Sequence, residues 1–167
     1  IFYTLIMTGA RIDEALHIKV EHFKRDYDFV TLYVTKIKAK KKQTKPEPRD
    51  ITLSKPYRRF IKKYIEEKKL ENNDFLFLDK NKDLEKQIIS KSIALRNIIK
   101  RHLKKLDIID YYNFSLHNIR KTHGMWLKAL NVKDSEICMR LGHDENTFRK
   151  HYGSCDVFKP NHLTQIK

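Results

Sequence analysis

The start of the chain has the hydrophobic spacing of helices. A first apolar run ends at Gly9, and Ile12, Ala15 and Leu16 then fall on one helical face. Because a glycine that closes an apolar run is typical of a helix end, the pattern predicts two short helices that meet at Thr8–Gly9. No capping residue precedes the first run, so we expect the chain to begin inside a helix of a longer protein.

Residues 29–35 alternate with the period of a half-buried β-strand. The alternation sets Val30, Leu32 and Val34 against Thr31, Tyr33 and Thr35. Residues 49–53 can pair with this strand, and the lysine-rich segment between the two contains Pro46 and Pro48. Since proline cannot donate to a strand ladder, we expect a mobile, basic hairpin loop here and a small antiparallel sheet. Residues 75–78 are predicted as a further short strand.

Five further segments have helical spacing. Ser54 is expected to cap the first of them, with Pro56 in its first turn. Its core-facing side chains are Tyr57, Phe60, Ile61, Tyr64 and Ile65. The other helices are predicted over 90–106, after a polar loop at 81–86, and over 116–130, 133–141 and 146–152. Trp126 is expected in the core, together with an apolar stripe of Ile93, Leu95, Ile98, Ile99, Leu103 and Leu106. The predicted fold is mainly α with a small antiparallel β-sheet, an α+β domain.

Charge suggests what this domain binds. The 167 residues fit one domain, and 36 Lys and Arg against 21 Asp and Glu give a net charge of +15. Such an excess favours a polyanionic partner, nucleic acid first, over a merely solubilising surface or a ribosome-associated protein. Cys138 and Cys155 lack the spacing of a zinc site or a disulfide framework, which fits a reducing cytoplasm. No apolar run approaches the ~18–20 residues that span a bilayer, so no membrane association is expected.

Several residues suited to phosphodiester chemistry lie in short boxes. Cleaving a phosphodiester without a metal needs cationic donors around the phosphate oxygens, together with a nucleophile, a base and an acid. Arginine is suited to the first task because its planar fork matches two phosphate oxygens. The boxes read TGARIDEAL at 8–16, SLHNIRKTHG at 115–124, LGH at 141–143 and HY at 151–152. Their order and spacing resemble the tyrosine recombinase and integrase family, and they span nearly the whole chain.

The resemblance implies a role for each matching residue. It implies that Arg11 and Arg120 clamp the scissile phosphate and that Tyr152 is the nucleophile. It also implies that His117 assists proton transfer from the tyrosine, that His143 donates to the phosphate, and that Glu14 braces an active-site arginine. Taken singly, an arginine, histidine or tyrosine is more often a surface or core residue, and only the joint spacing favours catalysis. His123 and His151 have no role in the family pattern and are interpreted as structural.

The resemblance places the general acid among the hairpin lysines. Lys36 directly follows the predicted strand and is preferred over Lys38 for protonating the leaving 5′ oxygen. The other hairpin lysines are expected to contact the DNA backbone; with Lys38 they are Lys40, Lys41, Lys42 and Lys45. No metal, ATP or other cofactor is implied, because the broken bond is conserved as a phosphotyrosine ester.

The implied function is that of a site-specific DNA recombinase or integrase that cuts and rejoins strands through a covalent 3′-phosphotyrosyl intermediate. Residues 1–167 would be its catalytic domain, with an N-terminal core-binding domain outside this chain. The implied partners are a double-stranded recombination site and three further copies of the chain, in a cytoplasmic, nucleoid-associated tetramer joined through the tail 153–167. The alternatives are relaxation of DNA like that of a type IB topoisomerase, which shares the catalytic set, and a non-catalytic, basic DNA-binding regulator.

Overall fold

The computed structural model describes residues 1–33, 47–146 and 148. The elements, in chain order, are α1 (Phe2–Thr8), α2 (Ile12–Leu16), the 3-10 turn η1 (Val20–His22), β1 (Phe23–Lys24), β2 (Phe29–Leu32), β3 (Arg49–Thr52), α3 (Lys55–Lys68), α4 (Leu84–Lys105), the 3-10 turn η2 (Tyr111–Asn113), α5 (Leu116–Ala129) and α6 (Asp134–Leu141). The predicted class, mainly helical with a small antiparallel sheet, is confirmed.

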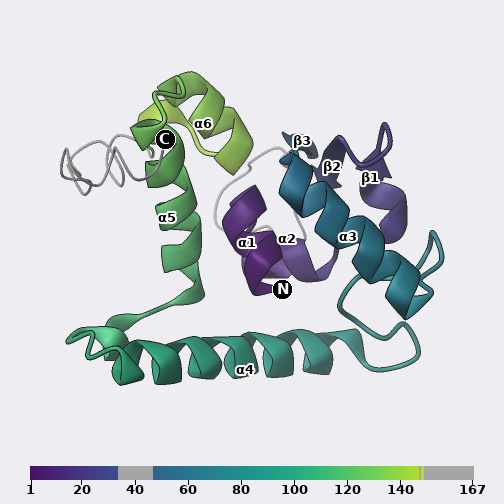
Figure 1. Ribbon diagram of the computed structural model, residues 1–167, viewed down its shortest axis with the longest axis horizontal. Helices are drawn as coiled ribbons and strands as arrows, with labels where there is room; N and C mark the ends of the chain where they lie inside the picture. The colour runs from purple at the N-terminus through teal and green to yellow at the C-terminus, as the bar shows by residue number, and fades with distance from the viewer. Residues whose placement is uncertain (34–46, 147, 149–167) are drawn as a thin grey trace, which may run out of the picture.

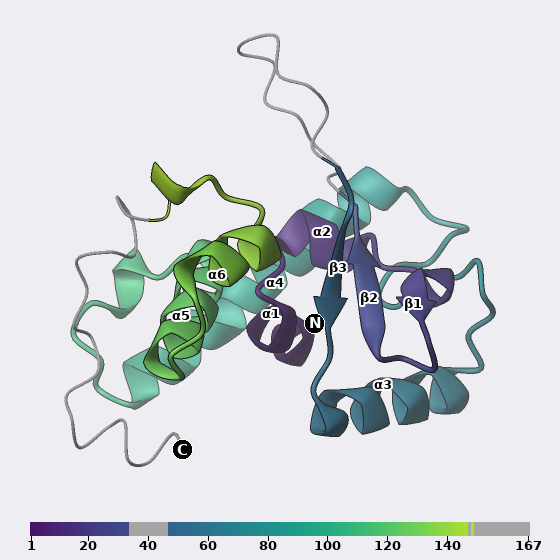
Figure 2. The same ribbon diagram turned by 90° about the horizontal axis from the view of Figure 1, so that it is seen from above.

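Helices α1 and α2 occupy the middle of the molecule, between the sheet with α3 on one side and α5 with α6 on the other (Figures 1 and 2). Helix α4 runs along one side, and α5 stands at a steep angle to it (Figure 1). The main core is formed by α1, α2, α3 and the sheet, and Ile119 joins it from α5. A smaller cluster of Ile137, Cys138, Leu141 and Phe148 holds α6 in place.

The junction of the first two helices is as predicted. Gly9 ends α1 in the left-handed region, with φ 65° and its N–H bonded to the carbonyl of Leu5. The Thr8 hydroxyl donates to the carbonyl of Thr4 at 2.7 Å and accepts the N–H of Ala10 at 3.2 Å. These bonds fix the direction in which the chain leaves α1 and enters α2.

The sheet has the order β1-β2-β3, and β2 pairs antiparallel with β3 as predicted. β1 was not predicted, because its two residues are too few for any periodicity to show. The prediction that Thr31 lies on an exposed face is wrong, since it is buried and its hydroxyl donates to Asp50 on β3 at 2.6 Å. The hairpin segment 34–46 lies outside the described residues.

Helix α3 begins where the sequence indicates, with Ser54 at its N-cap and proline in its first turn. The Ser54 side chain makes no capping hydrogen bond, so only the position of the cap was predicted correctly. Tyr57 and Ile61 are buried as expected, whereas Phe60 remains largely exposed at the edge of the core face.

Helix α4 differs most from its prediction. It begins at Leu84, inside the segment expected to be a polar loop, because the Asp83 side chain caps it by accepting the N–H of Lys86 at 3.0 Å. The expected core stripe is wrong in part: Ile93, Ile98 and Leu106 are largely exposed. The reason is that only one side of α4 meets the main core, through the partly buried Leu95 and Ile99, so Ile93, Ile98 and Leu106 are left uncovered.

The remaining segments agree with the prediction to different degrees. Residues 75–78 form only an isolated bridge, Lys19 with Phe75, and not the predicted strand. Helices α5 and α6 match their predicted ranges within a residue or two, and Trp126 is half-buried. The predicted helix at 146–152 lies mostly outside the described residues. Within the described ranges, no helix has the length and apolar character needed to cross a membrane.

Candidate active site

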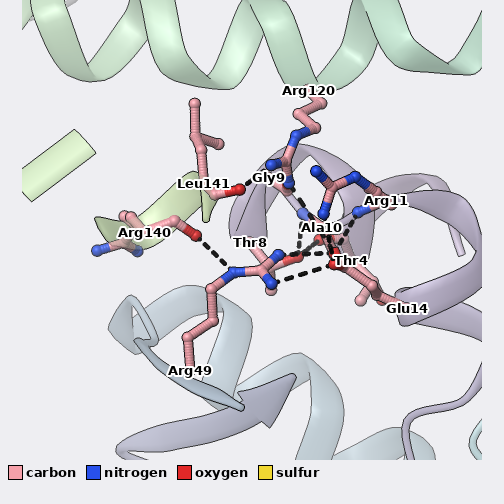
Figure 3. Close-up of polar contacts among 10 residues, drawn as sticks. All are labelled: Thr4, Thr8, Gly9, Ala10, Arg11, Glu14, Arg49, Arg120, Arg140 and Leu141. Carbon is pink, nitrogen blue, oxygen red and sulfur yellow. Dashed lines mark hydrogen bonds and ion pairs between the residues drawn. The ribbon is translucent and has the colours of Figure 1, made fainter. Parts of the chain in front are cut away.

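The candidate site is built around the carboxylate of Glu14, at the start of α2 (Figure 3). Its side chain is 2% exposed. Oε2 accepts the backbone N–H of Arg11 at 2.7 Å, and Oε1 accepts Nη1 of the same residue at 3.0 Å. Because Arg11 is the N-cap of a short helix, the pair is held by local backbone geometry. The Arg11 side chain is nevertheless 44% exposed, so part of it faces the surface.

A second arginine, Arg49, reaches Glu14 from the sheet. Its Nη2 donates to Oε2 at 2.6 Å and its Nη1 to Oε1 at 3.1 Å, a two-pronged pair. Its Nε donates to the carbonyl of Arg140 at 3.0 Å, which ties β3 to the end of α6. The sequence interpretation missed this residue. The signal was present, because Arg49, Ile51 and Leu53 share one face of the predicted strand, and an arginine on a buried face needs a carboxylate.

Arg120 completes the cluster from the middle of α5. Its side chain is 1% exposed, with Nη1 donating to the carbonyl of Gly9 at 2.7 Å and Nη2 donating to the carbonyl of Leu141. Nη1 lies 3.9 Å from Oε2 of Glu14. Arg120 thus holds the α1–α2 junction and the end of α6 against α5.

The charges around Glu14 decide its protonation. Burial alone would raise its pKa, but the hydrogen bonds and charge of Arg49, followed by those of Arg11, outweigh burial and lower the pKa below its usual value. Glu14 is therefore an anion among three cations. The cluster keeps a positive excess, which suits an anionic group such as a phosphate.

His143 follows the cluster directly in space. Gly142 ends α6 in the left-handed region, and the His143 N–H then bonds to the carbonyl of Cys138 at 3.0 Å. Partial burial, followed by the charges of Arg120, Arg11, His117 and Arg49, lowers the pKa of this half-buried histidine to about 4. These contributions indicate that His143 lies within electrostatic range of the arginines, where an added anion would favour its protonated form.

His117 lies in the first turn of α5 and is exposed. Its charge contributes to the lowered pKa of His143, so the two rings lie within electrostatic range of each other. The structure joins three predicted residues by direct ion pairs, Arg11, Glu14 and Arg120. It places His143 within electrostatic range of both arginines and of His117. The other predicted residues lie outside the described residues: Lys36, Lys38, Lys40, Lys41, Lys42, Lys45 and Tyr152.

His123 lies behind the cluster, buried between α5 and α1. Its Nδ1 lies 2.7 Å from the carbonyl of Ile6. A Cβ added to Gly9 would come within 2.5 Å of its ring, so the histidine fills the space that glycine leaves. This packing fits the structural interpretation given to it.

The described residues include no group of three or more His, Cys, Asp or Glu side chains placed to hold a metal ion. What the cluster offers instead is guanidinium and imidazole N–H donors on a rigid support. Such donors bind phosphate oxygens and stabilise charge that develops on them.

Comparison with known proteins identifies the family. The model of the phage integrase family matches residues 1–156, which is most of the chain. The chain belongs to the phage integrase family. Its predicted resemblance to tyrosine recombinases is thereby confirmed.

Solved structures share the fold of this integrase-family chain. XerA recombinase matches with a TM-score of 0.65 at 15% identity, over 98% of this chain and 54% of its own. A Tn1549 transposon integrase in complex with transposon right-end DNA also matches with a TM-score of 0.65 at 15% identity, over 98% of this chain and 56% of its own. The chain thus spans little more than half the length of these solved chains. No curated protein matches it.

Proposed function

We propose that this chain is the catalytic domain of a site-specific DNA recombinase that cleaves and rejoins strands through a 3′-phosphotyrosyl intermediate. The observation that carries the proposal is the cluster in which Arg11 and Arg120, from distant parts of the sequence, meet at one buried carboxylate beside His143. Two fixed arginines beside a histidine form a receptor for a phosphodiester. Membership of the phage integrase family supports the same reaction.

In the proposed reaction, Oη of Tyr152 attacks the scissile phosphorus while His117 assists removal of the phenolic proton. The bond from phosphorus to the 5′ oxygen breaks, and Lys36 protonates that oxygen. The products are a tyrosine ester of the 3′ phosphate and a free 5′ hydroxyl. Rejoining is attack by a 5′ hydroxyl on this ester, which needs neither metal nor ATP, because the ester conserves the broken phosphodiester bond.

Arg11, Arg120 and His143 act on the phosphate in this scheme. Their donors bind its non-bridging oxygens, where negative charge accumulates in the transition state. A bound phosphate also offsets the charges of the neighbouring cations and so favours the protonated form of His143, against the burial that contributes most to its lowered pKa.

We infer that the partner is double-stranded DNA. The net charge of +15 supports this, as does the DNA-bound state of the similarly folded Tn1549 integrase. The hairpin lysines are proposed to contact the DNA backbone and the whole protein to act in the cytoplasm at the nucleoid. Residues 1–167 are proposed to form one catalytic domain that a DNA-clamping domain completes in the full protein.

Covalent trapping tests the proposal. A duplex nicked next to the cleavage position loses the 5′ fragment and traps the cleaved state. The full protein is expected to yield a DNA–protein adduct that survives denaturation, and its Tyr152→Phe variant none. Absence of the adduct with the wild-type protein would leave the DNA-binding regulator as the better reading. Relaxation of supercoiled circles without exchange between sites would favour the topoisomerase.

Assembly is proposed to involve the tail. Residues 153–167 contain apolar Val157, Phe158, Leu163 and Ile166, which suit docking on a second copy of the chain in a DNA-bound tetramer. Deleting 158–167 is expected to abolish pairing of two sites in a gel-shift assay while single-site binding persists. Undiminished pairing would contradict this proposal.

A further inference from the structure

Arg49 is the first residue of β3, and it closes the described part of the sheet opposite Leu32 on β2, next to the hairpin that carries Lys36. Its side chain is 11% exposed, and each of its three guanidinium nitrogens donates a hydrogen bond. Two of these reach Glu14 and one reaches the carbonyl of Arg140. A side chain so engaged is suited to positioning its neighbours, not to binding DNA itself.

The first consequence concerns the charge of Glu14. Arg49 makes the two-pronged contact, whereas Arg11 contributes a single side-chain bond and Arg120 stays at 3.9 Å. Coulomb attraction is strong in such a buried site. Without Arg49, the carboxylate would bind the Arg11 side chain more tightly and draw Arg120 toward itself, and Arg120 would leave the carbonyls of Gly9 and Leu141. The donors proposed to clamp the phosphate would then be aimed at Glu14.

The second consequence concerns His143. Gly142 lies against the Arg49 guanidinium so closely that an added Cβ would come within 3.3 Å of Nη1. The bond from Nε to the carbonyl of Arg140 fixes the turn just before it. Since the next residue is His143, the position of this ring follows that of Arg49. The close-up shows the guanidinium lying between Glu14 and the Arg140 carbonyl (Figure 3).

We propose that Arg49 is a positioning residue of the cleavage site, which limits the pull of Glu14 on Arg11, keeps Arg120 from closing on Glu14 and sets the place of His143. The inference rests on the proposed function, because it assigns Arg49 a task in that reaction. Arg49 also connects the edge of the sheet, where segment 34–46 leaves β2 and returns to β3, to the arginine cluster.

The test measures single-turnover formation of the covalent adduct on nicked DNA, with affinity followed separately by fluorescence anisotropy. Arg49→Gln is expected to slow adduct formation about 100-fold, as misplaced catalytic groups do, and to change the dissociation constant less than about threefold. Arg49→Lys keeps the charge but not the fork, so an intermediate rate is expected. Arg58→Gln is the matched control: Arg58 also pairs with an aspartate, Asp28, but lies on α3, and its variant should keep the wild-type rate.

The double variant Glu14→Gln/Arg49→Gln separates positioning from a purely structural role. With the carboxylate charge removed as well, Arg11 and Arg120 are no longer drawn away, so this variant should form adduct at least about tenfold faster than Arg49→Gln. It also carries the test if Arg49→Gln alone fails to fold, because it removes both members of the two-pronged pair while Arg120 keeps its bonds to the carbonyls of Gly9 and Leu141; it should then fold and be active.

Three outcomes would overturn the inference. They are a wild-type rate in Arg49→Gln, a double variant as slow as or slower than the single one, and an unfolded or inactive double variant where Arg49→Gln does not fold. In each case a wild-type adduct leaves the proposed function standing. A wild-type protein that forms no adduct overturns the proposed function itself, and the role of Arg49 with it.

Discussion

Glu14 is a carboxylate almost removed from water, which is tolerated only because cations surround it. Desolvation works against its charge, and the hydrogen bonds of Arg49 and Arg11 outweigh it. The residue thereby fixes two arginines that come from different elements. The positions of both arginines thus depend on this one carboxylate.

Replacing Glu14 by alanine should be costly for this reason. The change leaves Arg49, a mostly buried guanidinium, without its carboxylate, and loss of one partner of such a pair costs about 3 kcal/mol or more. Urea unfolding measures the loss. Glu21→Gln is the control, because Glu21 forms an exposed pair with Lys19 at 3.2 Å, where a loss below about 1 kcal/mol is expected. Equal losses at the two sites would contradict this account.

His123 should make stability depend on pH. Its pKa is lowered from the usual 6.5 to about 4, mainly by burial; the bond to the Ile6 carbonyl opposes the shift, and the charges of Arg140 and Arg120 contribute to it. Between these values the unfolded chain binds a proton that the folded ring rejects, so the free energy of unfolding falls as the pH falls through this window. From pH 7 to pH 5 the loss from this ring is about 2 kcal/mol.

The measurement compares urea unfolding of the wild type and His123→Gln at both pH values. The variant lacks the ring, so its stability should decline less between pH 7 and pH 5, by about the stated amount. His143 also has a lowered pKa but is present in both proteins, and its contribution therefore cancels in the comparison. If both proteins lost the same free energy of unfolding between pH 7 and pH 5, protonation of His123 would not destabilise the fold.

The residues show what sequence reasoning can and cannot reach. Arg11, Glu14, Arg120 and His143 were predicted because they stand in boxes with recognisable spacing, and the structure joins the first three by ion pairs. Arg49 stands in no such box, and its importance depends on a contact across the fold with Glu14 and with the end of α6. Its place on the buried face of a strand was the only local signal.

At the scale of elements, two left-handed glycines set the turns on either side of the arginines. Gly9 has φ 65° and Gly142 has φ 59°. Both would strain a side chain to a similar degree, but their surroundings differ. A Cβ at Gly9 would meet the buried ring of His123 at 2.5 Å, whereas one at Gly142 would approach Arg49 at 3.3 Å.

Alanine at the two positions should therefore have unequal effects. Gly142→Ala is expected to lower the free energy of unfolding by about 1 kcal/mol, the strain of the left-handed backbone alone. Gly9→Ala adds overpacking against His123 and Leu141, for a total of about 3 kcal/mol. Urea unfolding of the two variants compares them directly. Similar losses would mean that α1 and α5 separate readily at Gly9.

Elements were predicted well where their packing is local and poorly where it depends on the rest of the fold. The helix pair at Gly9 and the pairing of β2 with β3 followed from turn residues and alternation. The core stripe assigned to α4 failed because periodicity shows which residues could be buried, and not whether another element reaches them. Ile88 is covered in α4, and Leu106, beyond its last turn, is 70% exposed.

For the whole molecule, charge is the feature most open to measurement. The net charge of +15 predicts binding to DNA that weakens steeply with salt, because each phosphate contact releases condensed counterions. Where on the molecule those contacts lie is a separate question. The hairpin lysines are the candidates, because they follow β2 and precede Arg49 at the edge of the arginine cluster.

Two sets of lysine substitutions test whether DNA binding depends on where the positive charge lies or only on how much of it the protein has. The first replaces the hairpin lysines Lys38, Lys40, Lys41, Lys42 and Lys45 by glutamine, and the second replaces the exposed Lys63, Lys68, Lys69, Lys80 and Lys82, which lie on α3 and in the segment after it. Both remove the same net charge. Since each lost phosphate contact lowers the slope of log affinity against log salt by about 0.9, the five substitutions of the first set should lower it by up to about 4.5 and those of the second by less than about 1. Anisotropy titrations of duplex DNA at several salt concentrations give both slopes. Equal reductions would mean that the hairpin acts only through the overall field of the protein and does not contact the DNA backbone.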